Sequence, residues 1–134
     1  MKHAVSILSL ALLASVACGA LPLVAAEPAY EVEYTNEKPL IVVRFNQRYV
    51  MYERPLYNTI SSALSAKADA MFDVVCITPK AHDAHDQTHY NQVAQQNCHK
   101  VLGTLQEMGL PQSRMNVTNA SDSVAFNEVR IFVR

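Results

Sequence analysis

A stripe of apolar side chains between residues 90 and 108 constrains the fold of this chain more than any other feature. Its members recur at steps of three and four residues, the spacing of one face of an α-helix: Tyr90, Ala94, Cys98, Val101, Leu105 and Met108. Gly109 and Pro111 follow at the places where a helix would end. The stripe therefore predicts a long amphipathic helix that must pack on neighbouring elements.

Short apolar runs before and after this helix predict strands. Residues 40–45 (LIVVRF) and 72–78 (FDVVCIT) precede it, and 115–118 and 129–133 follow it. A first helix is expected between the first two strands, from Pro55 to about Ala70, since apolar residues there recur at helical spacing. We further expect a polar loop over 79–87, a helix cap at Asp86 or Thr88, and a polar turn over 119–123.

The predicted order of elements is β-α-β-α-β-β. Helices that alternate with strands, followed by a closing hairpin, predict an α/β (α+β) two-layer sandwich with both helices on one face of a mixed sheet. Cys76 on the second strand and Cys98 on the helical stripe would then face each other. They are candidates for a disulfide, and two buried free thiols are the alternative.

The first 26 residues have the pattern of a secretory signal peptide. A basic start (Met-Lys-His) precedes a nearly unbroken apolar run, and Val24-Ala25-Ala26 puts small residues before Glu27. Cys18 after Ser15-Val16-Ala17 resembles a bacterial lipobox, so a lipid-anchored form on Cys18 is the alternative. We predict a signal peptide over 1–26, a linker over 27–38 and one domain over 39–134.

Charge and composition exclude some classes of function. Removal of residues 1–26 takes away one lysine and no acid, which moves the formal charge from −1 to −2. A chain that is not basic is a poor nucleic-acid binder. We find no phosphate-binding loop, nucleophile elbow or well-placed carboxylate pair, and Cys98 beside His99 would face a different direction on a helix. We therefore expect no enzyme activity and no cofactor.

The order of these patterns resembles the OmpA-like domain, a periplasmic module of Gram-negative envelope proteins that binds peptidoglycan. The similarity is closest over Asp83 and His89-Tyr90-Asn91-Gln92, where an Asp is followed eight residues later by an Asn. It continues to Gly109-Leu110-Pro111 and Arg114, and the closing Asn127-Glu128-Val129-Arg130-Ile131 resembles the last strand of the family. The resemblance implies the family's sandwich fold and a periplasmic location, with an outer-membrane lipoprotein as the alternative.

The resemblance also implies a ligand site. In the family, the loop Asp and an Arg on the next helix hold the ammonium and carboxylate of diaminopimelate in peptidoglycan. Asp83 occupies the Asp position, Asn91 the following Asn, and the Arg position falls on Asn97 or Cys98. Neither replacement carries a positive charge, and loss of one half of a charge clamp costs several kcal/mol. Peptidoglycan binding is therefore expected to be weak or lost.

These expectations combine into a predicted function. The chain would be a non-catalytic binding module and scaffold in an envelope assembly of the secretion type, with envelope proteins or peptidoglycan as partners. The alternative is a small periplasmic metal-binding protein or hydrolase that uses His82, His85 and His89. We interpret that histidine group as a solvated loop, so no metal site is predicted. Three tyrosines, Tyr49, Tyr52 and Tyr57, are candidates for an aromatic contact patch.

Overall fold

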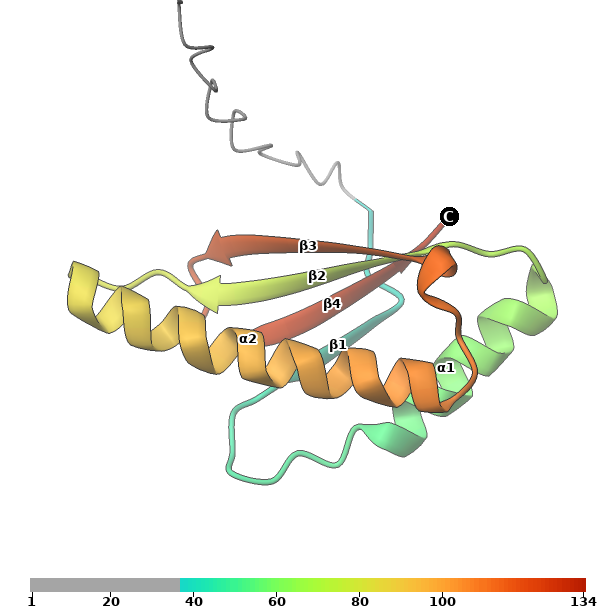
Figure 1. Ribbon diagram of the computed structural model, residues 1–134, viewed down its shortest axis with the longest axis horizontal. Coiled ribbons are helices and arrows are strands. Elements are labelled where there is room, and N and C mark those ends of the chain that lie inside the picture. Colours follow the sequence, from blue (N-terminus) through green and yellow to red (C-terminus); the bar gives the residue numbers. More distant parts are fainter. Residues whose placement is uncertain (1–36) are drawn as a thin grey trace, which may run out of the picture. The chain divides into compact units, whose positions relative to one another are not determined.

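The computed structural model describes residues 37–134. The predicted signal peptide, Cys18 and nearly all of the predicted linker lie outside the described residues. The elements follow in the order β1 (Ile41–Arg44), α1 (Glu53–Ala66), β2 (Phe72–Pro79), α2 (Ala84–Glu107), a short 3-10 helix (Gln112–Arg114), β3 (Met115–Asp122) and β4 (Glu128–Val133). The predicted α+β class, with two helices and one mixed sheet, is confirmed (Figure 1).

The sheet has the strand order β1-β4-β2-β3, and the predicted closing hairpin is wrong. β3 runs parallel to β2, whereas β4 lies antiparallel between β1 and β2. The burial of the two strands explains the arrangement. β4 buries Val129 and Ile131 on one side and Phe132 on the other, which suits a central strand, whereas β3 has no buried residue and suits an edge.

β3 is longer than predicted. All eight of its residues pair with β2, from Met115 opposite Phe72 to Asp122 opposite Pro79. Residues 119–122, which we expected in a turn, therefore belong to the strand. The cause is tertiary: pairing with a buried neighbour holds the polar segment Asn-Ala-Ser-Asp extended against its local preference for turns.

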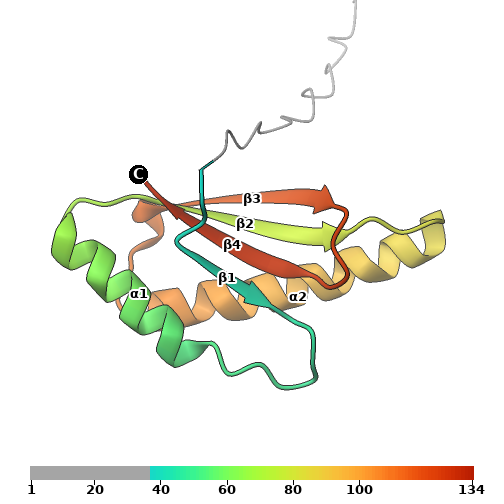
Figure 2. The same ribbon diagram turned by 180° about the vertical axis from the view of Figure 1, so that it is seen from behind.

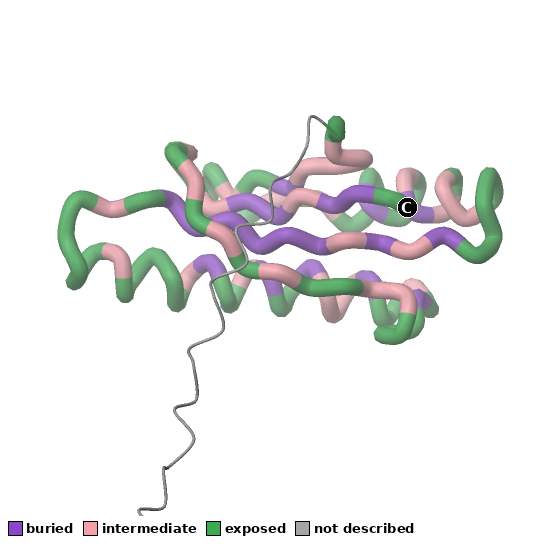
Figure 3. Tube along the Cα trace, turned by 90° about the horizontal axis from the view of Figure 1, so that it is seen from above, coloured by how far each residue is buried: buried purple, intermediate pink, exposed green. Residues whose placement is uncertain are grey.

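Both helices cover the same face of the sheet (Figures 1 and 2). Leu56 and Ile60 of α1 join the stripe of α2 and the inward residues of β1, β2 and β4 in one core. Figure 3 shows the buried residues gathered along the central strands and on the inner sides of the helices. Val75, Ile77 and Phe132 form a smaller cluster on the opposite face.

Two helix boundaries differ from the prediction. α1 ends at Ala66, about one turn before Ala70, because Lys67 is extended and the chain turns so that Ala70 is buried. α2 begins at Ala84, since the carboxylate of Asp83 accepts a hydrogen bond from the Asp86 N–H at 2.8 Å. Asp83 is therefore the N-cap, and neither Asp86 nor Thr88 is.

The C-terminal end of α2 follows the predicted pattern. Gly109 has a φ of +90°, a left-handed conformation that favours glycine. Its N–H donates to the carbonyl of Gln106 at 2.9 Å, and the Leu110 N–H donates to the carbonyl of Leu105 at 3.1 Å. This pair of bonds is the Schellman motif, and it buries Leu110 against the core.

The disulfide between Cys76 and Cys98 is present. It joins β2 to α2 with a Cα–Cα distance of 5.7 Å, and both residues are buried. The alternative of two free thiols is therefore wrong for this structure. The bond fixes the middle of α2 to the sheet.

Candidate functional site

Asp83 lies at the exposed N-terminal end of α2. Its carboxylate caps the helix, and among residues 37–134 no arginine or lysine forms an ion pair with it. Gln87 holds the preceding loop by accepting from the Ala81 N–H at 2.9 Å and donating to the Pro79 carbonyl at 3.1 Å. Gln87 thus holds the loop that leads to Asp83. The Asp83 carboxylate itself accepts the capping hydrogen bond from the Asp86 N–H.

Asn91 lies two turns further along α2 and is exposed. Its side-chain oxygen accepts a hydrogen bond from Gln87 Nε2 at 3.1 Å. The contact lies on the helix surface and links residues one turn apart. Asn91 and Asp83 are about 12 Å apart along the axis, from a rise of about 1.5 Å per residue.

Asn97 is half-buried and connects α2 to the segment before β4. Its Nδ2 donates to Asn127 Oδ1 at 2.8 Å, and its Oδ1 accepts from Lys100 Nζ at 3.4 Å. Asp83 and Asn97 are separated by fourteen residues of one straight helix, or about 21 Å at 1.5 Å per residue. The structure does not bring the two residues together.

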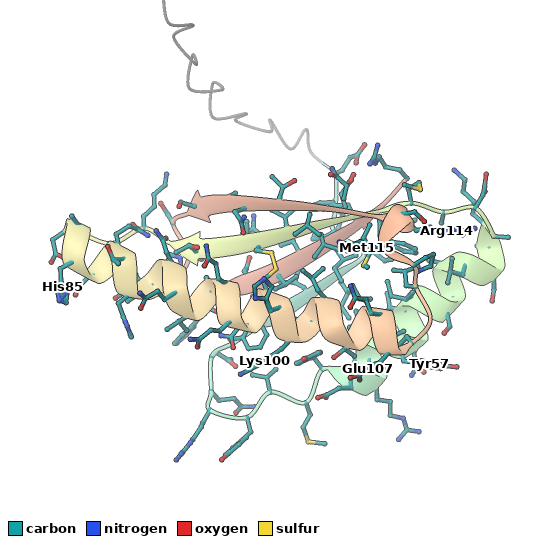
Figure 4. All side chains as sticks on the ribbon, in the orientation of Figure 1. Tyr57, His85, Lys100, Glu107, Arg114 and Met115 are labelled. Atoms are coloured by element: carbon teal, nitrogen blue, oxygen red, sulfur yellow. A yellow bond between two sulfur atoms is a disulfide. The ribbon has the colours of Figure 1, made fainter. Side chains whose placement is uncertain are left out.

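A groove of about 530 Å³ lies between α2 and the loop over residues 45–52. Its lining includes three side chains from α2 and several from the loop: Val93, Asn97 and Lys100, and Phe45, Arg48, Tyr49, Met51 and Tyr52. Asn97 is the one predicted ligand residue that lines it, and Asn127 closes it beside Asn97. Figure 4 shows Lys100 labelled on the side of α2 nearest the loop.

The groove brings together cations, amides and exposed aromatic surface. Arg48 and Lys100 contribute two positive charges against the single negative charge of Glu53. The guanidinium of Arg48 lies 5.7 Å from the centre of the Tyr49 ring, and Tyr49 and Met51 are 77% and 89% exposed. Such a surface suits a ligand that has apolar parts and carboxylates.

Two aromatic contacts support the base of the loop. The rings of Phe45 and Tyr52 meet edge to face with centres 5.9 Å apart. The Tyr52 hydroxyl lies 3.4 Å from Thr104 Oγ1 on α2. Of the three tyrosines predicted as a contact patch, Tyr49 and Tyr52 line the groove, while Tyr57 lies exposed on α1.

A ladder of ion pairs crosses the sheet face that the helices leave open. Buried Glu128 accepts from Arg130 Nε at 2.6 Å and from Arg44 Nε at 3.1 Å, and Arg130 Nη2 reaches Asp122 at 3.0 Å. The Ser123 N–H, and then Arg130, lower the pKa of Asp122 below its usual range. These groups satisfy one another, so the ladder is a structural feature of the sheet.

The histidines do not form a site of three ligands. His82 lies in the loop before α2, and His85 and His89 lie one turn apart on the exposed helix. Figure 4 labels His85 at the N-terminal end of α2. Within the described part of the chain, no group of three or more His, Cys, Asp or Glu side chains is arranged to hold a metal ion. The predicted loop over 79–87 is partly helix, which separates His82 from the other two.

The sequence did not identify the groove as a site. The loop over 45–52 has no periodic pattern, and Asn127 is remote from α2 along the chain. The sequence feature that indicates this surface is the run Arg48-Tyr49 with Met51-Tyr52. So many large side chains in a short loop are difficult to bury, and they are expected on the surface. Within residues 37–134, no helix is long and apolar enough to span a membrane.

Comparisons with known proteins leave the family open: no protein-family model and no curated protein matches this chain.

Proposed function

We propose that this chain is a non-catalytic binding module of the periplasm, with an OmpA-like topology, and that it serves as a scaffold in a cell-envelope assembly. The order β-α-β-α-β-β and the packing of both helices on one face support that topology. One observation carries the functional part. The cationic, amide and aromatic side chains suited to binding line the groove beside Asn97, and Asn97 lies about 21 Å from Asp83 along α2.

This separation argues for weak or no association with peptidoglycan. The free carboxylate and ammonium of diaminopimelate share one carbon atom, so the groups that hold them must lie within a few ångströms of each other. Asp83 at one end of the helix and an uncharged amide at Asn97 do not meet that requirement. Asn97 also uses its side-chain nitrogen on Asn127.

The groove fits a protein partner better. Tyrosine, methionine and arginine are enriched in protein–protein interfaces, and Tyr49, Met51 and Arg48 are presented together by one supported loop. Arg48 and Lys100 favour a partner segment with a carboxylate. The disulfide and the core beneath α2 hold the helix wall of the groove in place, so a partner meets a preformed surface.

Two binding assays test this proposal. In the first, the purified protein is sedimented with peptidoglycan sacculi. We expect little retention and no change with Asp83→Ala; strong retention that Asp83→Ala abolishes would contradict the proposal.

In the second assay, a photo-crosslinking residue replaces Tyr49 in cells, with exposed Gln95 on α2 as the matched control position. We expect a discrete protein adduct from position 49, loss of that adduct with Lys100→Glu, and none from position 95. Equal adducts from both positions, or no adduct from position 49, would contradict a scaffold that binds through the groove.

A further inference from the structure

The outer edge of β3 is the longest strand edge that the sheet presents. β3 ends the strand order, and its eight residues pair with β2 on one side only. Within residues 37–134 no strand pairs with the other side, so every second residue directs its backbone N–H and C=O outward. Figures 1 and 2 both show β3 along the outer border of the sheet.

This edge lacks the features with which proteins usually protect an edge strand. Met115–Asp122 contains no proline, lysine or arginine, and its register with β2 is continuous, so there is no bulge. Its one charged residue, Asp122, is held by Arg130. The opposite edge differs, since β1 has only four residues, follows Pro39 and ends in the exposed Arg44.

The helices do not extend beneath β3. Val117, Asn119 and Ser121 point to the helix side of the sheet, because they pair with Val74, Cys76 and Thr78 of β2, yet all three are exposed. Val117 is 44% exposed. A strand added at this edge would therefore meet no helix in its path and would cover Val117.

We propose that this edge joins two copies of the chain through antiparallel pairing of β3 with β3, giving one continuous eight-stranded sheet. A two-fold axis normal to the sheet relates the copies, so both helix layers lie on the same side. Residues opposite each other in a sheet point to the same face. The register must therefore centre on one residue, which pairs with its own counterpart.

The charges select Thr118 as that residue. With Thr118 opposite Thr118, seven residues of each strand overlap. Position 114, just before β3, then lies opposite position 122, so Arg114, whose Nη1 donates to the Ala68 carbonyl, would approach the Asp122–Arg130 pair of the second copy and could add a further donor to that carboxylate. Figure 4 labels Arg114 and Met115 at the beginning of β3. A register centred on Asn119 overlaps as much but leaves Asp122 opposite Asn116, and one centred on Val117 overlaps less. In the Thr118 register no like charges meet, and the threonine pair is itself favourable.

Cysteine crosslinking tests both the pairing and its register. Thr118→Cys, in a Cys18→Ser background, places two thiols opposite each other at about 5 Å between Cα atoms, within the range of a disulfide. The matched control is Asn116→Cys on the same face. Its counterpart lies four residues along the strand, or about 14 Å away, which is too far for a bond. Under mild oxidation we expect a covalent dimer from Thr118→Cys and none from Asn116→Cys.

Sedimentation velocity over a concentration series gives an independent measurement without new thiols. We expect a dimer whose dissociation constant rises at least about tenfold with Thr118→Lys, because two like charges then lie opposite each other. Gln95→Lys on exposed α2 adds the same charge elsewhere and should have no effect. A monomer at all concentrations, equal crosslinking of both cysteine variants, or crosslinking of Asn119→Cys in place of Thr118→Cys would overturn the proposal.

Discussion

The two halves of α2 belong to the same helix and differ in almost every physical respect. Residues 94–107 bury Ala94, Cys98, Val101 and Leu105, carry the disulfide and end in the Schellman motif. Residues 84–93 bury no residue and are held by the Asp83 cap, by the hydrogen bond between Gln87 and Asn91, and by the bonds of Gln87 to the loop at Pro79 and Ala81. One half stabilises the fold, and the other projects from it.

The contrast affects how the resemblance to OmpA-like domains is interpreted. The closest local similarity, Asp83 with His89–Gln92, falls in the half that buries no residue. The α2 residues that line the groove are Asn97 and Lys100 of the other half, with Val93 at the boundary between the two. A ligand motif in the sequence thus does not place its residues in one site unless packing bends the chain to bring them together.

The largest expected effect is the loss of core packing in the buried half. Leu105 is fully buried, so Leu105→Ala should lower the free energy of unfolding by about 3 kcal/mol. Tyr90, on the same predicted stripe but 38% exposed, serves as the matched position in the projecting half. Tyr90→Ala should cost less than about 1 kcal/mol in the same urea titration. Equal losses would show that the two halves pack alike.

A similar effect is expected from removing the disulfide that fixes the buried half. The bond spans 22 residues, and closing a loop of that size is worth about 3 kcal/mol on the chain-entropy model. The double variant Cys76→Ala with Cys98→Ala should lose about that amount in urea unfolding. Reductant should destabilise the wild type to the same level and leave the double variant unchanged. If reductant destabilises both proteins equally, the assigned cause is wrong.

A smaller, local effect is expected at the projecting end. Asp83→Ala removes a cap worth about 1 kcal/mol to the first turn of α2. Because that turn buries nothing, hydrogen exchange at residues 84–87 should accelerate while the global free energy of unfolding changes by less than about 0.5 kcal/mol. Asp83→Asn should behave like the wild type, since asparagine caps equally well. A global loss above about 2 kcal/mol would mean that the two halves are coupled.

The smallest effect concerns the acid stability of the sheet. The pKa of Asp122 is lowered in the folded protein from its ordinary value of 3.8, first by the Ser123 N–H and then by Arg130. The ionised Asp122 carboxylate therefore makes its full contribution to the free energy of unfolding above about pH 4. That contribution is lost as the pH falls through the lower pKa of the folded state. In urea titrations between about pH 2 and 4, the free energy of unfolding of Asp122→Asn should depend less steeply on pH than that of the wild type. An unchanged slope would contradict the assignment.

Sequence patterns predicted the elements that bury a regular stripe. The strands at 40–45 and 72–78, the core of α2 and its termination at Gly109 all follow from periodicity and from one left-handed glycine. The length of β3 and the insertion of β4 into the centre of the sheet could not be predicted in this way. Both depend on which strand has buried residues on two faces, a property of the assembled sheet.

The candidate site was harder to predict for a related reason. Asp83 was identified by position, but its capping role and its distance from Asn97 depend on where α2 begins, a boundary that local preferences placed too late. The contact between Asn97 and Asn127 joins residues 30 apart and leaves no local signal. For the groove, the sequence alone indicates only that the aromatic and cationic residues of the loop over 45–52 are too many for a small core to bury.

The most direct test of this account is an NMR titration of the isotope-labelled protein with a diaminopimelate-containing muropeptide, followed residue by residue along α2. Because Asp83 and Asn97 lie half a helix apart, we expect no saturable shift that includes both, and any weak shifts should fall on Tyr49, Asn97 and Lys100 in the groove. A saturable response shared by Asp83, Asn91 and Asn97 would show that one ligand contacts both halves of α2, and the division proposed here would be wrong.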